Sequence, residues 1–198
     1  TVKGIQGHTA NGHRAENPIH YLTELISNIL KTPLDEGSEF FLPTSIQIPT
    51  IDVGNPASNV IPEYAKASIN IRFNDQHTAE SLIEWLEEKI NSIFSNKKNV
   101  SCKLSHEING RSFLNKPGKL SEIVAKSISQ ATGRNNEPEL ATDGGTSDAR
   151  FIKNYCEVIE LGIRNQTLHK IDEYIYLNDL KELTNIYYQI LENYFIKN

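Results

Sequence analysis

The sequence of 198 residues lacks methionine, has only two cysteines and contains no long apolar run. No stretch approaches the roughly 18 apolar residues of a membrane helix, so we expect no membrane segment. Cys102 and Cys156 fit neither a CxxC metal motif nor a disulfide framework, and we interpret them as buried, reduced thiols of a cytoplasmic protein. The chain starts at Thr1, with neither an initiator methionine nor a signal-like segment. We therefore expect it to be a piece of a longer protein.

Strong positive charge is also absent. The net charge is −5 and the basic residues are scattered, so nothing resembles the basic stripe that neutralises a phosphate backbone. Nucleic acid is therefore not an expected partner. The sequence also lacks an HExxH zinc motif, the lysine of a P-loop, a dinucleotide fingerprint and a GxSxG nucleophile elbow. These absences disfavour nucleotide binding and covalent catalysis.

The first half of the chain alternates between strand and helix patterns. Period-two alternation predicts strands near residues 1–7, 44–53, 65–73 and 100–104. Helical spacing of apolar residues follows Asn17–Pro18 and Thr78, which we expect to be helix starts. The order strand, helix, strand, strand, helix, strand predicts an α+β module of the split β-α-β, ferredoxin-like type, in two layers, ending near Glu107. Pro49 indicates that its strand lies at an edge or contains a bulge. That strand or the first helix could supply a dimer contact.

The second half is organised differently, from Gly110 onward. Helical segments are predicted near 120–131, near 148–153, and in a last helix capped by Asn178 and Asp179. Only one convincing strand, residues 156–161, lies among them. Because a lone strand cannot form a sheet, we expect this unit to pack on sequence outside the chain.

The polar loop after that predicted strand carries Asn165, Thr167 and His169. Open α/β sheets form their ligand crevices at the carboxyl ends of strands, so this loop is a candidate site. His169, with Asp172 or Glu173 nearby, could be a metal ligand or a solvated loop histidine.

Three other features each have a functional and a purely structural interpretation. The loop from His8 to His13 could hold a metal or direct a donor at an oxyanion, or it could be a turn stabilised by Asn11 and Gly12. The Gly-rich segment 143–148 could be a nest of backbone N–H groups for an anion, or simply a turn that leads into a short helix. Arg72 could clamp a carboxylate or could be a solvated surface charge.

Five stretches of the chain together resemble a known family. They are GIQGHTANGHRAENPIH, EFFLPTSIQIPTIDVGNPASNVIP, INIRFN, TDGGTSDARFI and ELGIRNQTLHKIDEYI. In this order they resemble the two-zinc aminoacylase and carboxypeptidase G family of metallopeptidases, and within it the desuccinylases. The resemblance implies a lid and dimerisation domain in residues 1–109. It further implies that residues 110–198 are the carboxyl-terminal part of an α/β zinc-peptidase catalytic domain whose amino-terminal half lies outside this chain.

The activity implied by this resemblance is hydrolysis of N-succinyl-LL-2,6-diaminopimelate to succinate and LL-diaminopimelate, in lysine and diaminopimelate biosynthesis. In such enzymes two divalent metal ions, zinc or cobalt, activate a bridging water. The implied partners are a second copy of the chain, bound through the lid, and a small dicarboxylate-type substrate. Another N-acyl-amino-acid amidohydrolase, such as an N-acetylornithine deacetylase, and a non-catalytic dimerisation module stay open as alternatives.

The resemblance also implies roles for individual residues. His169 would be a metal ligand, and His8 would enter the active site of the partner subunit and support the oxyanion. The residues that would bind the substrate's carboxylates and amide are Asn59, Arg72, Gly145, Thr146 and Asn165. Asn11–Gly12–His13 replaces a frequent Tyr-Pro-His, which puts any contact made by that tyrosine in doubt. Because the other metal ligands and the general-base glutamate belong to the absent half, the chain alone is expected to be inactive and to bind zinc weakly or not at all.

Overall fold

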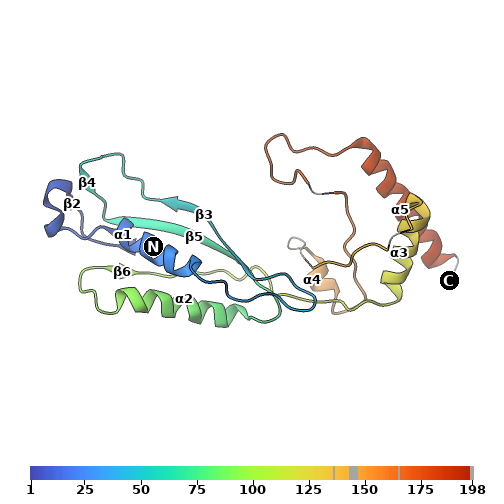
Figure 1. Cartoon of the computed structure of the whole chain (residues 1–198), viewed down its shortest axis with the longest axis horizontal. Coiled ribbons are helices and arrows are strands. Elements are labelled where there is room, and N and C mark those ends of the chain that lie inside the picture. Colours follow the sequence, from blue (N-terminus) through green and yellow to red (C-terminus); the bar gives the residue numbers. More distant parts are fainter. Residues whose placement is uncertain (136, 143–146, 165, 197–198) are drawn as a thin grey trace. The chain divides into compact units, whose positions relative to one another are not determined.

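The computed structural model describes residues 1–135, 137–142, 147–164 and 166–196. The chain divides into two compact units, Thr1–Ser112 and Phe113–Asn198 (Figure 1). Within the described part of the chain, no helix has both the length and the apolar character needed to cross a membrane.

The first unit is built on a four-stranded antiparallel sheet. Its strands are β1 (Val2–Lys3), β3 (Ser45–Asp52), β5 (Tyr64–Arg72) and β6 (Ser101–Cys102), in the order β3-β5-β1-β6. Helices α1 (Pro18–Leu30) and α2 (Ala79–Phe94) connect them. Residues of both helices share one core with Val2 of β1 and Ala65 of β5. The predicted split β-α-β fold is therefore confirmed.

Local sequence explains the ends of both helices. The side chain of Asn17 accepts a hydrogen bond from the backbone N–H of Ile19, and Pro18 occupies the first turn, where no N–H is needed. Thr78 and Ser81 form a reciprocal capping box at the start of α2. Both predicted N-caps are confirmed.

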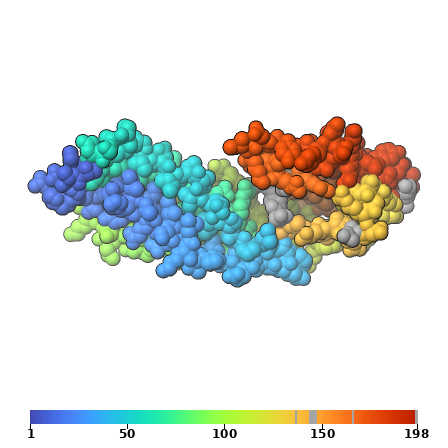
Figure 2. Space-filling view, turned by 45° about the horizontal axis from the view of Figure 1, so that its top comes forward, coloured from blue at the N-terminus to red at the C-terminus, as the bar shows by residue number. Residues whose placement is uncertain are grey.

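The strand that contains Pro49 has both features predicted for it. β3 is the outer strand of the sheet, and its register with β5 shifts between Gln47 and Thr50. The shift accommodates a residue that cannot donate a ladder hydrogen bond. Most of β3 is exposed, and the surface view shows this region of the chain in cyan (Figure 2).

A small ribbon extends the first unit beyond β1. It pairs β2 (Gly7–His8) with β4 (Val60–Ile61) in antiparallel register and includes the 3-10 helix η1 (Thr9–Arg14). The sequence had predicted one continuous strand for residues 1–7. The structure instead interrupts it, since Ile5 forms only an isolated bridge with Glu16.

The second unit consists of helices and loops. Helix α3 (Lys119–Thr132) packs on α5 (Leu177–Phe195), and α4 (Ala149–Ile152) is a single turn. The amide of Asn193 joins the two long helices by donating to Ser127 Oγ at 2.9 Å and to Gln130 Oε1 at 2.8 Å. Helix α5 leaves several apolar side chains exposed along its length, from Leu177 to Phe195.

Three predictions for the second unit are wrong. Cys156 is exposed and not buried. Residues 156–161 form no strand, because no described segment of this unit offers a partner for backbone pairing. Asn178 and Asp179 do not cap the last helix, which begins earlier, with Tyr176 at the N-cap and no side-chain cap bond. Asp179 lies instead in the first turn, where its charge is favourable near the helix amino terminus.

Candidate functional site

His8 and Asn59 lie close together in the small ribbon. His8 is the Cα partner of Val60, the residue after Asn59. The next residue, Thr9, donates two hydrogen bonds to the carbonyl oxygen of Asn59, from its backbone N–H at 3.0 Å and from its hydroxyl at 3.3 Å. The structure therefore brings two of the predicted site residues into one local element.

The hydrogen bonding of His8 fixes the position of its ring proton. The backbone N–H of Ala10 donates to His8 Nδ1 at 3.0 Å, as part of the N-cap of η1. Nδ1 must therefore be unprotonated, and the proton of a neutral imidazole sits on Nε2. Because the residue is exposed, this leaves an N–H group that can donate to a developing negative charge.

A shallow groove of about 450 Å³ lies beside this ribbon. Its lining consists of Thr9, Asn17, Ile19, Asn55, Pro56, Ala57, Ser58, Val60, Ile61 and Pro62. The loop on one side is ordered by Asn55, which donates to the Val60 carbonyl at 2.8 Å and accepts from the Ala57 N–H at 3.2 Å. Asn59 therefore lies within a loop whose shape is fixed by its own hydrogen bonds.

Arg72 lies at the opposite end of the first unit from His8 and Asn59. It is the last residue of β5, and its Cα partner in β3 is Ser45. The ribbon adjoins the other end of β5, next to Tyr64 (Figure 1). A rise of about 3.3 Å per residue puts roughly 26 Å between the two ends of this strand. One copy of the unit cannot bring Arg72 and His8 to the same small substrate.

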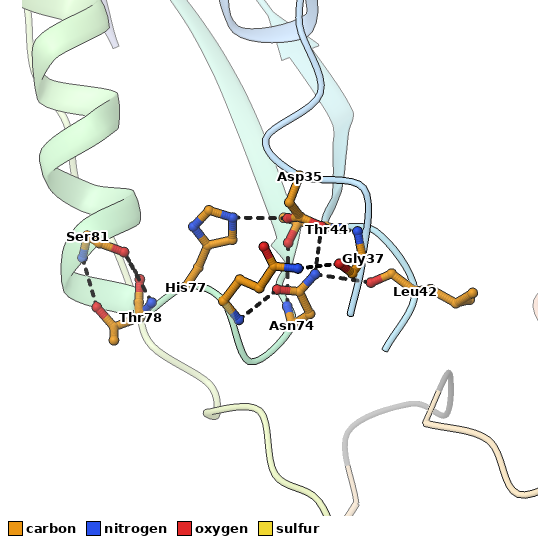
Figure 3. Close-up of polar contacts among 9 residues, drawn as sticks. Asp35, Gly37, Leu42, Thr44, Asn74, His77, Thr78 and Ser81 are labelled. Atoms are coloured by element: carbon orange, nitrogen blue, oxygen red, sulfur yellow. Dashed lines mark hydrogen bonds and ion pairs between the residues drawn. The ribbon is translucent and has the colours of Figure 1, made fainter. Parts of the chain in front are cut away.

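A buried polar network lies just beyond Arg72, and the sequence did not predict it (Figure 3). At its centre is Asp35, whose side chain is 4% exposed. Its carboxylate accepts hydrogen bonds from the N–H groups of Gly37 at 2.8 Å and Thr44 at 3.1 Å. It also accepts from Asn74 Nδ2 at 2.7 Å and from His77 Nε2 at 3.0 Å.

These donors decide the charge of Asp35. Burial favours its neutral form, but hydrogen bonds from Thr44, Gly37 and Asn74 outweigh burial and hold the pKa of Asp35 far below its ordinary value. A carboxyl whose pKa is lowered by folding stabilises the fold above its unfolded-state pKa of about 4. That stabilisation is lost as the pH falls from there toward the folded-state pKa.

Asp35→Asn should therefore make unfolding less dependent on pH. We expect a loss of about 1–3 kcal/mol at neutral pH, because an amide group replaces an acceptor that faces four donors. We also expect a shallower decline of the unfolding free energy between about pH 5 and pH 3. Urea unfolding at a series of pH values, followed by the fluorescence of Trp85 in α2, measures both effects.

Asp75→Asn is the control, because it removes an exposed carboxylate nearby. It should leave the slope of unfolding free energy against pH unchanged. Equal slopes for Asp35→Asn and the parent chain would contradict the assignment.

His169 occupies a tightly turned loop in the second unit. Its backbone adopts the left-handed conformation, with φ of 58°, and so does that of Asp172. The hydroxyl of Thr167 closes the loop by donating to the Tyr174 carbonyl at 2.6 Å and accepting from the Tyr174 N–H at 3.2 Å. The N–H of His169 donates to Glu173 Oε2 at 3.3 Å. Left-handed backbone at residues other than glycine is uncommon and clusters at functional sites.

The imidazole of His169 is exposed and makes no hydrogen bond with the described residues. Among these residues no group of three or more histidine, cysteine, aspartate or glutamate side chains could hold a metal ion. Catalytic zinc sites usually have three protein ligands. His169 fits a metal site only as one ligand among others that the described part of the chain does not supply.

Three of the predicted substrate-binding residues, Gly145, Thr146 and Asn165, fall outside the described residues. The other two, Asn59 and Arg72, lie at opposite ends of the first unit.

The sequence around Asp35 does contain one sign of the turn that it forms, because an Asp two residues before a glycine is typical of an Asx turn. Gly37 has a φ of 90°, which explains the glycine in this turn.

Comparisons with known proteins agree on the family. Residues 1–98 match the family described as the peptidase dimerisation domain, M20. The chain is 48% identical over 192 residues to a succinyl-diaminopimelate desuccinylase of Paracoccus denitrificans, covering 97% of the chain and 50% of that protein. A protein of the same name from Nitrobacter hamburgensis is 46% identical over 195 residues, which cover 98% of this chain and 49% of that protein. The chain thus spans about half the length of these curated relatives.

Solved structures show the same fold at lower sequence identity. A tripeptidase from Staphylococcus aureus superposes with a TM-score of 0.72 at 17% identity, over 97% of this chain and 49% of that one. The structure of AtUAH in complex with glyoxylate superposes with a TM-score of 0.68 at 20% identity, over 97% of this chain and 45% of that one. At such identities the likeness describes the fold alone.

Proposed function

Because the chain belongs to the M20 family of peptidases, whose dimerisation domain it carries in residues 1–98, we propose that the whole protein is a metal-dependent amidohydrolase. Its substrate is N-succinyl-LL-2,6-diaminopimelate, and its products are succinate and LL-diaminopimelate. The observation that carries this proposal is the 48% identity to a desuccinylase over 97% of the chain. The substrate is a soluble metabolite of amino-acid biosynthesis, so the protein would act in the cytoplasm.

In this proposal the chain contributes two parts of the enzyme. Residues 1–109 are the lid, which joins two copies as a homodimer, and residues 110–198 complete a catalytic domain whose other part lies outside this chain. The apolar residues exposed on α5 support this division, because they are the surface on which a missing layer would pack. They include Leu180, Tyr187, Leu191 and Tyr194.

His169 would be one ligand of a site for two divalent metal ions, zinc or cobalt. When bound, such ions would lower the pKa of a coordinated water and polarise the scissile carbonyl. Other residues would bind and orient the substrate. Arg72 would clamp a substrate carboxylate through its planar guanidinium, with help from Gly145, Thr146 and Asn165. Asn59 lies beside His8, so it would contribute to the same site as His8, in the partner subunit.

His8 would stabilise the transition state. Its Nε2–H, fixed by the bond from Ala10 to Nδ1, would donate to the oxyanion that forms when water attacks the amide. The length of β5, about 26 Å, separates Arg72 from the ribbon that carries His8, so the two residues would serve different active sites of the dimer. This separation supports a site completed by His8 of the partner.

Substrate preference tests the proposal. The full-length protein should hydrolyse N-succinyl-diaminopimelate with a kcat/KM well above that for N-acetylornithine, measured by amine release with zinc present. The reverse preference would make it an N-acetyl-amino-acid deacetylase of the same family. The isolated chain should hydrolyse neither substrate, since one histidine ligand cannot hold two catalytic metals. Absence of all hydrolysis by the metal-loaded, full-length dimer would favour a non-catalytic dimerisation role.

A further inference from the structure

The connection between α1 and β3 contains no residue of the hydrophobic core. Residues 31–44 form this connection, and every buried core residue of the first unit lies elsewhere. Its shape is therefore set by polar contacts, and most of them converge on the carboxylate of Asp35. Gln76 adds a hydrogen bond to the Gly37 carbonyl, and Asn74 donates to the Leu42 carbonyl at 3.2 Å.

This network holds the backbone next to Arg72 in β5 and next to its pairing partner in β3. Just before β3, the Asp35 carboxylate accepts from the N–H of Thr44, and the next residue, Ser45, is the Cα partner of Arg72. Just after β5, it accepts from the side chain of Asn74, two residues beyond Arg72. The backbone N–H of Asn74 also reaches the Thr44 hydroxyl at 3.4 Å. Figure 3 shows the Asp35 carboxylate between Thr44 and Asn74. This one buried carboxylate therefore ties the start of β3 to the end of β5, where Arg72 pairs with Ser45.

A network of this kind defines geometry more than it adds stability. A buried ionised group is costly to desolvate, and an apolar replacement of similar size is often at least as stable. A fully hydrogen-bonded buried network does, however, hold its members rigidly. Asn74 is 2% exposed and Asp35 has four donors, so this end of the sheet has little freedom.

We propose that Asp35 is a positioning residue for Arg72. By fixing the ends of β3 and β5 together, it sets the place from which the Arg72 guanidinium reaches the substrate carboxylate. This inference rests on the proposed function, in which Arg72 binds that carboxylate. A bidentate arginine contact requires a defined orientation, and misplacement by about 1 Å can cost up to about 100-fold.

The test is a double-mutant cycle in the full-length enzyme, with the steady-state kinetics of desuccinylation as the readout. Asp35→Asn should raise KM about tenfold and leave kcat within about twofold, because it weakens an interaction present in both ground and transition states. Arg72→Ala should raise KM by about 10- to 100-fold. In the Arg72→Ala background, Asp35→Asn should change KM by less than about twofold, because the residue it positions is gone.

Two further variants separate positioning from loss of stability. Thr78→Ala removes the cap of α2 in the same domain and should lower the unfolding midpoint without changing KM. Thr44→Val keeps the N–H that binds Asp35 but removes the hydroxyl that accepts from Asn74, so it should raise KM in the same direction by a smaller factor. This milder variant carries the test if Asp35→Asn does not fold.

The outcomes distinguish the two proposals. If Arg72→Ala leaves KM unchanged, the substrate-binding role of Arg72 in the proposed function is wrong. If Arg72→Ala raises KM but Asp35→Asn and Thr44→Val do not, the positioning role of Asp35 is wrong. Full additivity of Asp35→Asn and Arg72→Ala, or an equal rise of KM in Thr78→Ala, would also overturn it.

Discussion

His8→Ala should lower the kcat of the full-length enzyme by about 10²- to 10³-fold, the usual cost of removing one oxyanion donor. KM should change little, because the donor acts mainly on charge that appears in the transition state. The structural basis is the bond from the Ala10 N–H to Nδ1, which leaves the proton on Nε2 of an exposed ring. Steady-state kinetics with the succinylated substrate measures the effect, and His20→Ala, another exposed histidine of the same unit, is the control.

Mixed dimers show in which subunit His8 acts. We expect dimers with His8→Ala in one subunit and His169→Ala in the other, isolated through two affinity tags, to have about half of the wild-type turnover. If His8 acts in the partner, the subunit with intact His169 receives an intact His8 and forms one complete site. If His8 acts in its own subunit, neither site is complete and the mixed dimer is inactive. The distance of about 26 Å along β5 favours the first result.

Local patterns in the sequence predicted the architecture of the first unit because its folding signals are local. The alternation of apolar and polar residues predicted β5. An apolar helical face that follows an N-cap residue predicted α1 and α2. Pro49 marked the edge strand and its irregular register for a steric reason that holds in any sheet. Short elements were predicted less well, since the two-residue strands β1 and β2 carry little periodic signal.

Features that depend on distant partners could not be predicted in this way. The Asp35 network joins residues 39 and 42 positions apart, and nothing in the sequence around Asp35 identifies Asn74 or His77 as its donors. The predicted strand at 156–161 fails for the same reason, because a strand exists only through its pairing partner. His169 was singled out from its loop, but its role as a ligand depends on groups that the described residues do not include.

His169→Ala should be the most damaging single substitution in the second unit. Loss of one metal ligand should lower kcat/KM of the full-length enzyme by on the order of 10³-fold, because in the proposed function the metals generate the attacking water. Bound zinc, measured by elemental analysis after dialysis, should fall in parallel. His106→Ala replaces an exposed histidine of the first unit and should change neither quantity. Full zinc content in His169→Ala would contradict the assignment of His169 as a ligand.

Thr167 provides a graded version of the same experiment. Its hydroxyl makes two hydrogen bonds to Tyr174 and closes the loop that presents His169 in a left-handed conformation. Thr167→Val keeps the size of the side chain but loses both bonds, so we expect zinc affinity to fall by about 10- to 100-fold, as for other residues that orient a ligand. Thr167→Ser keeps the hydroxyl and should retain most of the affinity. Competition with a chelator measures both constants. If Thr167→Val binds zinc as tightly as the parent, the rigidity of this loop does not contribute to the metal site.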